Sequence, residues 1–315
     1  MPSLSTTGID TYPLALGTNT FGWTADEATS HRILDAFVAA GGNMIDSADA
    51  YSIWVPGHTG GESETVIGSW LASGAPRGRV LISSKISGNP NHSGLSAANI
   101  VEGIERSLER LRTDYLDVYY AHYDDPATPL EETVGAFEDL RREGLIRRVG
   151  LSNYSGARIQ EWIDVARMTG AALPEVIQPN YNLVARRPFE EGVRPVAERN
   201  QLAVVPYFGL ASGFLTGKYR KPADLNGVAR SQFLEPYATQ QGFAVVSELT
   251  AVADELGTEP ATVALAWLRG RPTIVAVLAS ASRLEQLAAL LASTTLELTA
   301  DQTERLAQAS QAPRQ

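Results

Sequence analysis

The sequence predicts an α/β protein, a (β/α)8 TIM barrel that forms a single domain over residues 1–315. Short runs rich in β-branched and aromatic residues alternate with segments whose apolar residues recur at helical spacing. No low-complexity segment or linker divides the chain. Eight strands that alternate with helices in 315 residues are typical of a closed barrel. We expect a short N-terminal β-hairpin before the barrel and a C-terminal helical extension after it.

The candidate strands are short apolar runs, of which the first has the weakest pattern. In chain order they are Leu14 to Asn19, Asn43 to Asp46, Val80 to Lys85, Leu116 to His122, Arg148 to Asn153, Val176 to Gln178, Ala203 to Tyr207 and Thr273 to Leu278.

The segments between these strands are predicted to be helices. Residues 24–40 open with Thr24 and Glu27, the pattern of a capping box, and stop at a pair of glycines. Two later segments each place apolar residues on one helical face: Ile100, Ile104, Leu108 and Leu111 in the first, and Leu130, Val134, Phe137 and Leu140 in the second. Arg141, Arg142 and Gly144 end the second of these helices.

An open, doubly wound sheet of similar length is the alternative topology. Its dinucleotide-binding fingerprint needs two glycines separated by one residue, and this pattern occurs nowhere in the chain. If the protein binds a dinucleotide, it therefore does so by another route, and the barrel is favoured.

Composition excludes several classes of function. The formal net charge of −10 argues against a broad nucleic-acid surface, which needs clustered Lys and Arg. The absence of cysteine excludes disulfides, thiolate nucleophiles and thiolate metal sites. The first ten residues lack the basic and apolar parts of a secretory signal, and no apolar run approaches the roughly 18 residues of a membrane span. We expect a cytoplasmic protein with no membrane, nucleic-acid or metal partner.

Polar residues stand at the ends of nearly all the predicted strands. They are Asp46, Lys85, His122, Ser152, Asn153, Gln178 and Tyr207. Each has a plain structural interpretation, such as a hydrogen-bonded core histidine or a structural Asp–Lys pair. The carboxyl ends of barrel strands meet at one rim, however, where the active site of such a barrel lies. A shared site explains the whole set better than separate structural roles.

Four of the residues near this rim form a coherent chemical set: Asp46, Tyr51, Lys85 and His122. A phenol has an unperturbed pKa of about 10, and an adjacent ammonium is expected to lower it. A carboxylate behind the ammonium keeps it charged, and a histidine can hydrogen-bond a substrate oxygen. The set predicts a proton donor that faces a carbonyl. Because the set contains no nucleophile, a cofactor must supply the other half of the reaction, and hydride transfer from a nicotinamide is the natural partner.

At this point the chain resembles the aldo-keto reductase superfamily over nearly its whole length. Seven motifs carry the resemblance in order: LGTNTFG at 16–22, IDSADAY at 45–51, SSK ending at Lys85, YLDVYYAH ending at His122, GLSNY at 150–154, QPNYN at 178–182 and LTGKY at 215–219. The resemblance implies that Tyr51 is the general acid, that Lys85 and Asp46 tune it, and that His122 orients the carbonyl.

The resemblance also implies a nicotinamide site. Ser152, Asn153 and Gln178 would bind the carboxamide, Tyr207 would stack on the ring, and Thr18 and Asp46 would contact the ribose. Ser212 to Lys218 would lie over the pyrophosphate, and the glycine-bearing backbone and the Lys218 charge suit a phosphate, although an ordinary turn is the alternative. Asn19, Phe208, Gly209, Leu210 and, by a loose match, Arg230 complete the expected set.

The cofactor preference depends on residues 279–287, where a strand ends and a helix begins with Leu284, Leu287, Leu290 and Leu291 on its buried side. A helix N-terminus attracts phosphate. Ser280, Ser282, Arg283 and Gln286 lie there, so we expect NADPH rather than NADH. Alternatively Ser282 is only an N-cap and Arg283 a solvated charge. The family's usual glycine, glutamate and asparagine are replaced by Ser280, Ala289 and Leu290.

On the substrate side we expect an aromatic mouth formed by Trp23, Trp54 and Tyr123, with Tyr154 nearby, that takes a small-molecule carbonyl. Asp124 and Asp125 would disfavour anionic substrates, unless Asp125 merely starts a turn before Pro126. Two other functions stay open. One is an NADPH-binding regulatory module like the potassium-channel β subunits, which carry an asparagine at the position of His122. The other is a glycosidase that uses paired carboxylates such as Asp46 and Asp124.

Overall fold

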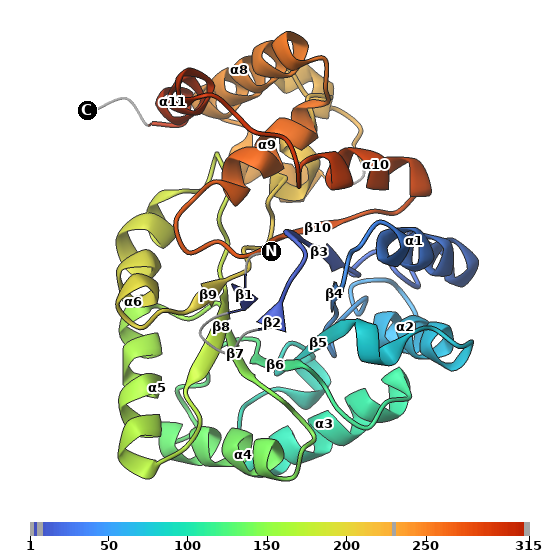
Figure 1. The fold of residues 1–315 in the computed structure, drawn as a ribbon, viewed down its shortest axis with the longest axis vertical. Helices are drawn as coiled ribbons and strands as arrows, with labels where there is room; N and C mark the ends of the chain where they lie inside the picture. The colour runs from blue at the N-terminus through green and yellow to red at the C-terminus, as the bar shows by residue number, and fades with distance from the viewer. Residues whose placement is uncertain (1–2, 5–8, 229–230, 312–315) are drawn as a thin grey trace.

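The computed structural model describes residues 3–4, 9–228 and 231–311, and its central feature is one eight-stranded parallel sheet with helices around it (Figure 1). The sheet order is β10-β3-β4-β5-β6-β7-β8-β9. The strands are β3 (Leu14–Gly17), β4 (Met44–Asp46), β5 (Leu81–Ile86), β6 (Val118–Ala121), β7 (Val149–Ser152), β8 (Pro174–Gln178), β9 (Ala203–Val204) and β10 (Val277–Ser280). All eight predicted strands contribute to this sheet.

Backbone hydrogen bonds also join β9 and the residues just after it to β10 and the residues just before it. The N–H of Val204 donates to the carbonyl of Thr273 at 3.0 Å, and the N–H of Val275 donates to the carbonyl of Val204 at 3.0 Å. One step further along, the N–H of Leu278 donates to the carbonyl of Pro206 at 3.2 Å. The curled parallel sheet is consistent with the expected (β/α)8 architecture.

The helices lie outside the strands, and α8, α9 and α11 lie near one another at the top of Figure 1. Their bounds are α1 (Glu27–Ala39), α2 (Glu62–Ala72), α3 (Ala97–Leu111), α4 (Leu130–Arg142), α5 (Gly156–Thr169), α6 (Arg194–Arg199), α7 (Ser231–Leu234), α8 (Gln240–Leu256), α9 (Pro260–Arg269), α10 (Leu284–Ala292) and α11 (Ala300–Ala309). Two short strands, β1 (Ser3–Leu4) and β2 (Ile9–Asp10), pair antiparallel.

The predicted apolar faces of α3 and α4 are confirmed, but the predicted capping box at the start of α1 is wrong. Helix α1 begins at Glu27, and its N-cap is Asp26, whose carboxylate accepts the N–H of Thr29. Thr24 lies outside the helix because the turn before it is closed by backbone bonds, among them one from the N–H of Ala25 to the carbonyl of Thr20. The Asp26 carboxylate therefore accepts one of the free N–H groups at the start of the helix.

Two separate apolar clusters make up the core, as strand alternation requires. The larger lies between the strands and the helices and includes Trp162, Phe137 and Trp267. The smaller fills the inside of the curled sheet and consists of Ala15, Met44, Val118, Tyr120, Val176, Ala203, Val205, Ala276 and Leu278. Gly150 makes room inside for the Tyr120 ring, because a Cβ at Gly150 would lie 2.3 Å from that ring.

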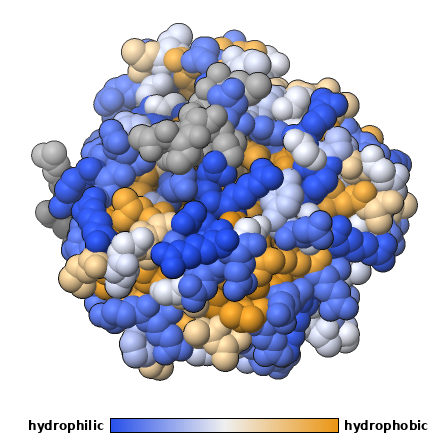
Figure 2. All heavy atoms as spheres, turned by 60° about the horizontal axis from the view of Figure 1, so that its bottom comes forward, coloured by the Kyte–Doolittle hydropathy of each residue, from blue (hydrophilic) through white to orange (hydrophobic). Residues whose placement is uncertain are grey.

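On the face shown in Figure 2, hydrophilic residues predominate and hydrophobic ones lie between them. Within the described residues, no helix combines the length and the apolar character that crossing a membrane requires.

Candidate active site

Polar residues take the last inward position of several strands, directly above the apolar inner cluster. Met44 points inward, so Asp46 two residues later does as well. The same alternation carries Val118 and Tyr120 to His122, and Val176 to Gln178. Because the strands are parallel and in register, with Asp46 beside Ser83 and Ser152 beside Gln178, these side chains share one rim.

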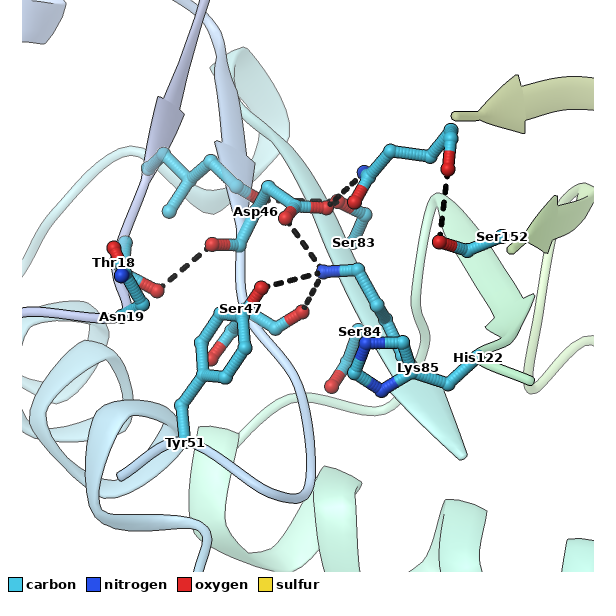
Figure 3. A network of polar contacts seen from close by, with 12 residues as sticks. Thr18, Asn19, Asp46, Ser47, Tyr51, Ser83, Ser84, Lys85, His122 and Ser152 are labelled. Atoms are coloured by element: carbon cyan, nitrogen blue, oxygen red, sulfur yellow. Dashed lines mark hydrogen bonds and ion pairs between the residues drawn. The ribbon is translucent and has the colours of Figure 1, made fainter. Parts of the chain in front are cut away.

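The Lys85 ammonium is the centre of this rim (Figure 3). Its Nζ donates to Asp46 Oδ2 at 2.6 Å, to the carbonyl of Ser47 at 2.6 Å and to the phenol oxygen of Tyr51 at 3.3 Å. The side chain is fully buried. Burial alone lowers the pKa of Lys85, but the Asp46 carboxylate and Tyr51 outweigh it and raise the pKa above its ordinary value. The ammonium is therefore charged at neutral pH.

Asp46 is buried and its carboxylate is fully bonded. While Oδ2 binds Lys85, Oδ1 accepts the hydroxyl of Ser83 at 2.7 Å and the amide nitrogen of Gln178 at 3.0 Å. A buried ion pair is tolerated when such further hydrogen bonds satisfy its oxygens. Asp46 thus holds Lys85 in one position beside Tyr51.

Tyr51 lies in the loop after β4 and comes back over the rim, where its phenol oxygen accepts a hydrogen bond from Lys85. The expected fall in its pKa is wrong for the protein alone: burial raises the pKa of the phenol above its ordinary value, and the charge of Lys85 offsets this only in part. The reason is that an anion loses more solvation here than one ammonium restores. The phenol is therefore neutral and carries its proton at neutral pH.

The His122 imidazole lies beside Lys85 and Tyr51, and its ring centroid is 6.5 Å from that of Tyr51 (Figure 3). Burial, together with the Lys85 charge, holds the pKa of His122 well below its ordinary value, so the ring is neutral. Among the described residues its Nδ1 has no hydrogen-bond partner. A Cβ at Gly88 would lie 2.3 Å from that nitrogen, so Gly88 leaves the space in which the ring sits.

A chain of hydrogen bonds extends from Asp46 along the expected nicotinamide residues. Gln178 binds Asp46, and the carbonyl of Gln178 accepts the hydroxyl of Ser152 at 2.9 Å. Asn153 donates to the Ser152 hydroxyl at 3.2 Å, and its amide oxygen accepts the hydroxyl of Tyr207 at 2.6 Å. The structure therefore brings all four of these predicted residues together with the Lys85 centre.

The segment expected over a pyrophosphate has an unusual backbone. Ser212 and Gly213 both have positive φ, 57° and 94°, and a Cβ at Gly213 would lie 3.7 Å from Lys218 Nζ. Consecutive N–H groups in such a conformation form a concave surface for anions, and Lys218 adds a positive charge beside it. The preceding Phe208 also has positive φ and is exposed. The predicted contact of Arg230 lies outside the described residues.

The residues expected to decide the cofactor preference lie between β10 and the first turn of α10. Ser280 donates to the side chain of Asn19 at 2.6 Å, which ties β10 to the loop after β3, where Thr18 donates to the carbonyl of Asp46. Ser282 is bound to Gln286 through its N–H and its hydroxyl. Arg283 is the N-cap of α10, and its side chain is exposed. Leu284 was expected on the buried side of α10 but is 38% exposed, whereas Leu287 and Leu290 are buried.

The aromatic mouth contains the three predicted substrate residues. Trp54 packs edge-on against Trp23 with ring centroids 5.7 Å apart and against Tyr51 at 5.9 Å, while Tyr123 stacks on His122 at 4.6 Å. Trp54 and Tyr123 are exposed. Tyr154 is not in the mouth, because it is buried against Trp162.

Both aspartates after His122 have hydrogen-bond or ion-pair partners. Asp125 accepts the N–H of Leu95 and of Ala127 and the hydroxyl of Thr128, as expected for a residue that starts a turn. Asp124 pairs with Arg158 at 2.9 Å. The repulsion of anionic substrates expected from Asp124 is therefore weakened in part, since Arg158 pairs with Asp124 and also with Glu161 at 2.8 Å.

Sequence reasoning missed several polar partners of the site. Ser83 binds Asp46 from inside the sheet, whereas its neighbour Ser84 points outward and binds Glu64 at 2.5 Å. Strand alternation could have predicted this difference, because Ser83 lies two residues before Lys85 and so shares its inward face, whereas Ser84 lies on the opposite face. Ser63 binds Thr18 at 2.7 Å across 45 residues, a contact for which the sequence has no local signal.

The chain is similar in sequence to a known family and to several known proteins. A sequence model described as Aldo/keto reductase family matches residues 13–311. The protein named Protein tas of Escherichia coli (strain K12) is 33% identical over 91% of each chain. A probable voltage-gated potassium channel subunit beta of Oryza sativa subsp. japonica is 35% identical over 85% of this chain and 82% of its own. An uncharacterized oxidoreductase, YrpG, of Bacillus subtilis (strain 168) is 33% identical over 90% and 87%.

Proposed function

The chain belongs to the aldo/keto reductase family, and on that premise we propose that it is an NADPH-dependent reductase that transfers hydride to an aldehyde or ketone, and in reverse oxidises the alcohol. Family membership and the oxidoreductase among the relatives support an oxidoreductase that uses a nicotinamide cofactor. The finer activity, the choice of cofactor and the residue roles are proposals that rest on the geometry of the site.

The single observation that carries the proposal is the Lys85 ammonium, which binds Asp46 and Tyr51 at the same time. The neutral Tyr51 phenol has a proton to give to a carbonyl oxygen that becomes an alkoxide. The phenolate left behind lies within hydrogen-bond reach of a positive charge that Asp46 keeps in place. Lys85 therefore stabilises the product of the proton transfer more than its starting state, which is what lowers the barrier.

His122 has a second task in this proposal. A neutral imidazole has one N–H donor, and beside Tyr51 it can hydrogen-bond the carbonyl oxygen without competing for the proton. Two donors on one oxygen orient the carbonyl and polarise it. Trp23, Trp54 and Tyr123 are proposed to cover the rest of the substrate and exclude water.

The residues present fit NADPH. The concave backbone at Ser212 and Gly213 with Lys218 suits a pyrophosphate, and the N-terminus of α10 with exposed Arg283 suits a 2′-phosphate. Asn153, Gln178 and Tyr207 are proposed to hold the nicotinamide. When bound, NADPH supplies the hydride, and every proton-handling group named above comes from the protein.

The test is NADPH oxidation at 340 nm against a panel of small aldehydes and ketones, with wild type and Tyr51→Phe. We expect turnover by the wild type, a loss of at least a thousandfold in the variant, and NADPH binding within threefold of wild type by protein fluorescence quenching. Equal turnover by both proteins would refute the role of Tyr51.

The same assay addresses the alternative of an NADPH-binding regulatory or redox-sensing module, which the potassium-channel subunits among the relatives suggest. NADPH binding by the wild type without turnover of any carbonyl in the panel would favour that alternative. His122 and the completed set around Lys85 favour the reductase.

A further inference from the structure

The loop between β4 and α2, residues 47–61, decides where Tyr51 lies, because it carries both Tyr51 and Trp54. From residue 53 to residue 60 every side chain in it is at least partly exposed. Apolar burial therefore contributes little to the conformation of residues 53–60, and polar contacts must hold this segment.

The Glu62 carboxylate is where these polar contacts converge. Its Oε1 accepts the N–H of Thr59 at 2.8 Å and of Gly60 at 3.3 Å, and its Oε2 accepts the N–H of Ser52 at 3.2 Å. Residues at both ends of the exposed segment are thus bound to one side chain. Glu62 is the first residue of α2, where the free helical N–H groups also favour a negative charge.

The peptide group between Tyr51 and Ser52 is held on both sides by the start of α2. The carbonyl of Tyr51 accepts the N–H of Gly61 at 2.9 Å and of Ser63 at 3.3 Å, while the N–H of Ser52 donates to Glu62. The hydroxyl of Ser52 reaches the carbonyl of Phe21 at 3.2 Å. Backbone bonds from Gly61 and Ser63 therefore hold one side of this peptide group, and the Glu62 carboxylate holds the other.

A carboxylate suits this position and an amide does not. Three N–H donors point at the side chain, and a carboxylate offers only acceptors to them, whereas glutamine would turn an NH2 group towards one side of the loop. Burial opposes the charge, but the N–H groups of Thr59, of Glu62 itself and of Ser52 outweigh it and lower the pKa of Glu62 below its ordinary value. The group is ionised at neutral pH.

We propose that Glu62 is a positioning residue. Its carboxylate holds the 47–61 loop in one conformation, so that the Tyr51 phenol stays beside Lys85 and the Trp54 ring stays against the Tyr51 ring. The expected effect on kcat rests on the proposed reductase function, whereas the expected effect on the conformation of the loop does not. A displacement of the proton donor by about 1 Å can cost about a hundredfold in rate, so a loosened loop should lower kcat.

The test compares Glu62→Gln with Glu131→Gln, which makes the same change in the first turn of another helix, α4, at an exposed position. Hydrogen exchange by mass spectrometry on peptides that cover residues 50–61 measures how firmly the loop is held, without any substrate. We expect exchange at least tenfold faster in Glu62→Gln and unchanged in Glu131→Gln, with both thermal midpoints within a few degrees of wild type.

Steady-state kinetics then test whether the change in the loop impairs Tyr51 as the proton donor. At saturating NADPH we expect kcat to fall at least tenfold in Glu62→Gln, NADPH affinity to stay within twofold, and Glu62→Asp to keep part of the rate. Unchanged loop exchange in Glu62→Gln overturns the proposal, and so does faster exchange with an unchanged kcat. A wild type that turns over no carbonyl refutes the reductase function instead, and the exchange experiment alone then decides whether Glu62 holds the loop.

Discussion

Replacing Asp49 by asparagine should make the protein more stable at neutral and alkaline pH. Asp49 is only 5% exposed, and neither of its carboxylate oxygens has a hydrogen bond within the described residues. Burial, and then the neighbouring Glu64 carboxylate, raise the pKa of Asp49 to about 7. Glu64 has its own partners, Ser84 and Arg110, whereas the charges of Arg110 and Lys85 compensate the Asp49 carboxylate only in part.

The size of the effect follows from this pKa. The pKa of Asp49 rises from 3.8 to about 7, and each pH unit of difference corresponds to 1.36 kcal/mol, so the charged form costs up to about 4 kcal/mol in the folded state. Structural relaxation reduces such a figure, and we expect about 2–4 kcal/mol.

The sign is set by which state holds the proton. The folded protein binds the Asp49 proton more tightly than the unfolded chain, so this group causes no loss of stability below about pH 4, and the loss grows until about pH 7. Urea unfolding followed by tryptophan fluorescence should therefore give equal free energies of unfolding for wild type and Asp49→Asn at pH 4. At pH 8 the variant should be more stable by about 2–4 kcal/mol.

A variant that is less stable than wild type at pH 8, or a difference that does not change between pH 4 and pH 8, would refute this reasoning. Either result would mean that the Asp49 carboxylate has a partner that compensates its charge. Glu64→Gln is the matched comparison: it leaves Arg110 without its carboxylate, so it should destabilise the protein at pH 8.

Three further predictions concern the site and the inner cluster. Gly88→Ala should lower kcat/KM about tenfold in the NADPH oxidation assay, because the added Cβ displaces the His122 ring, whereas Gly135→Ala, with open space around its Cβ, should leave kcat/KM unchanged. Gly150→Ala should lower the free energy of unfolding in urea by about 1–3 kcal/mol, since its Cβ would overlap the Tyr120 ring; unchanged stability would contradict the packing. Arg283→Ala should weaken NADPH binding about tenfold and NADH binding hardly at all by fluorescence titration, and an equal loss for both cofactors would count against a 2′-phosphate site.

Much of the fold and the centre of the site could be predicted from the sequence. The strands around Asp46, Lys85 and His122 are short β-branched or aromatic runs, and the face of α4 follows from apolar residues at helical spacing. Once the strands are parallel and alternate with helices, their carboxyl ends must lie at one rim. That rule is sufficient to predict that Asp46, Lys85 and His122 lie together.

Other features were decided by contacts between residues that are distant in the chain. The N-cap of α1 is Asp26 and not the predicted Thr24, because backbone hydrogen bonds already close the turn that contains Thr24. Tyr154 was expected near the mouth from its position after a strand, yet it is buried against Trp162. The pKa of Tyr51 rises because burial outweighs one ammonium, a balance that depends on how much water the folded chain excludes.

The sequence by itself determined the order of strands and helices and the residue types at the strand ends, because periodicity and propensity act over neighbouring residues. Only the tertiary structure decided the direction of the Tyr51 pKa, the burial of Asp49 without a partner among the described residues and the convergence of three N–H groups on Glu62. Solvation and hydrogen-bond geometry depend on every group packed around a side chain, and most of those groups come from elsewhere in the chain.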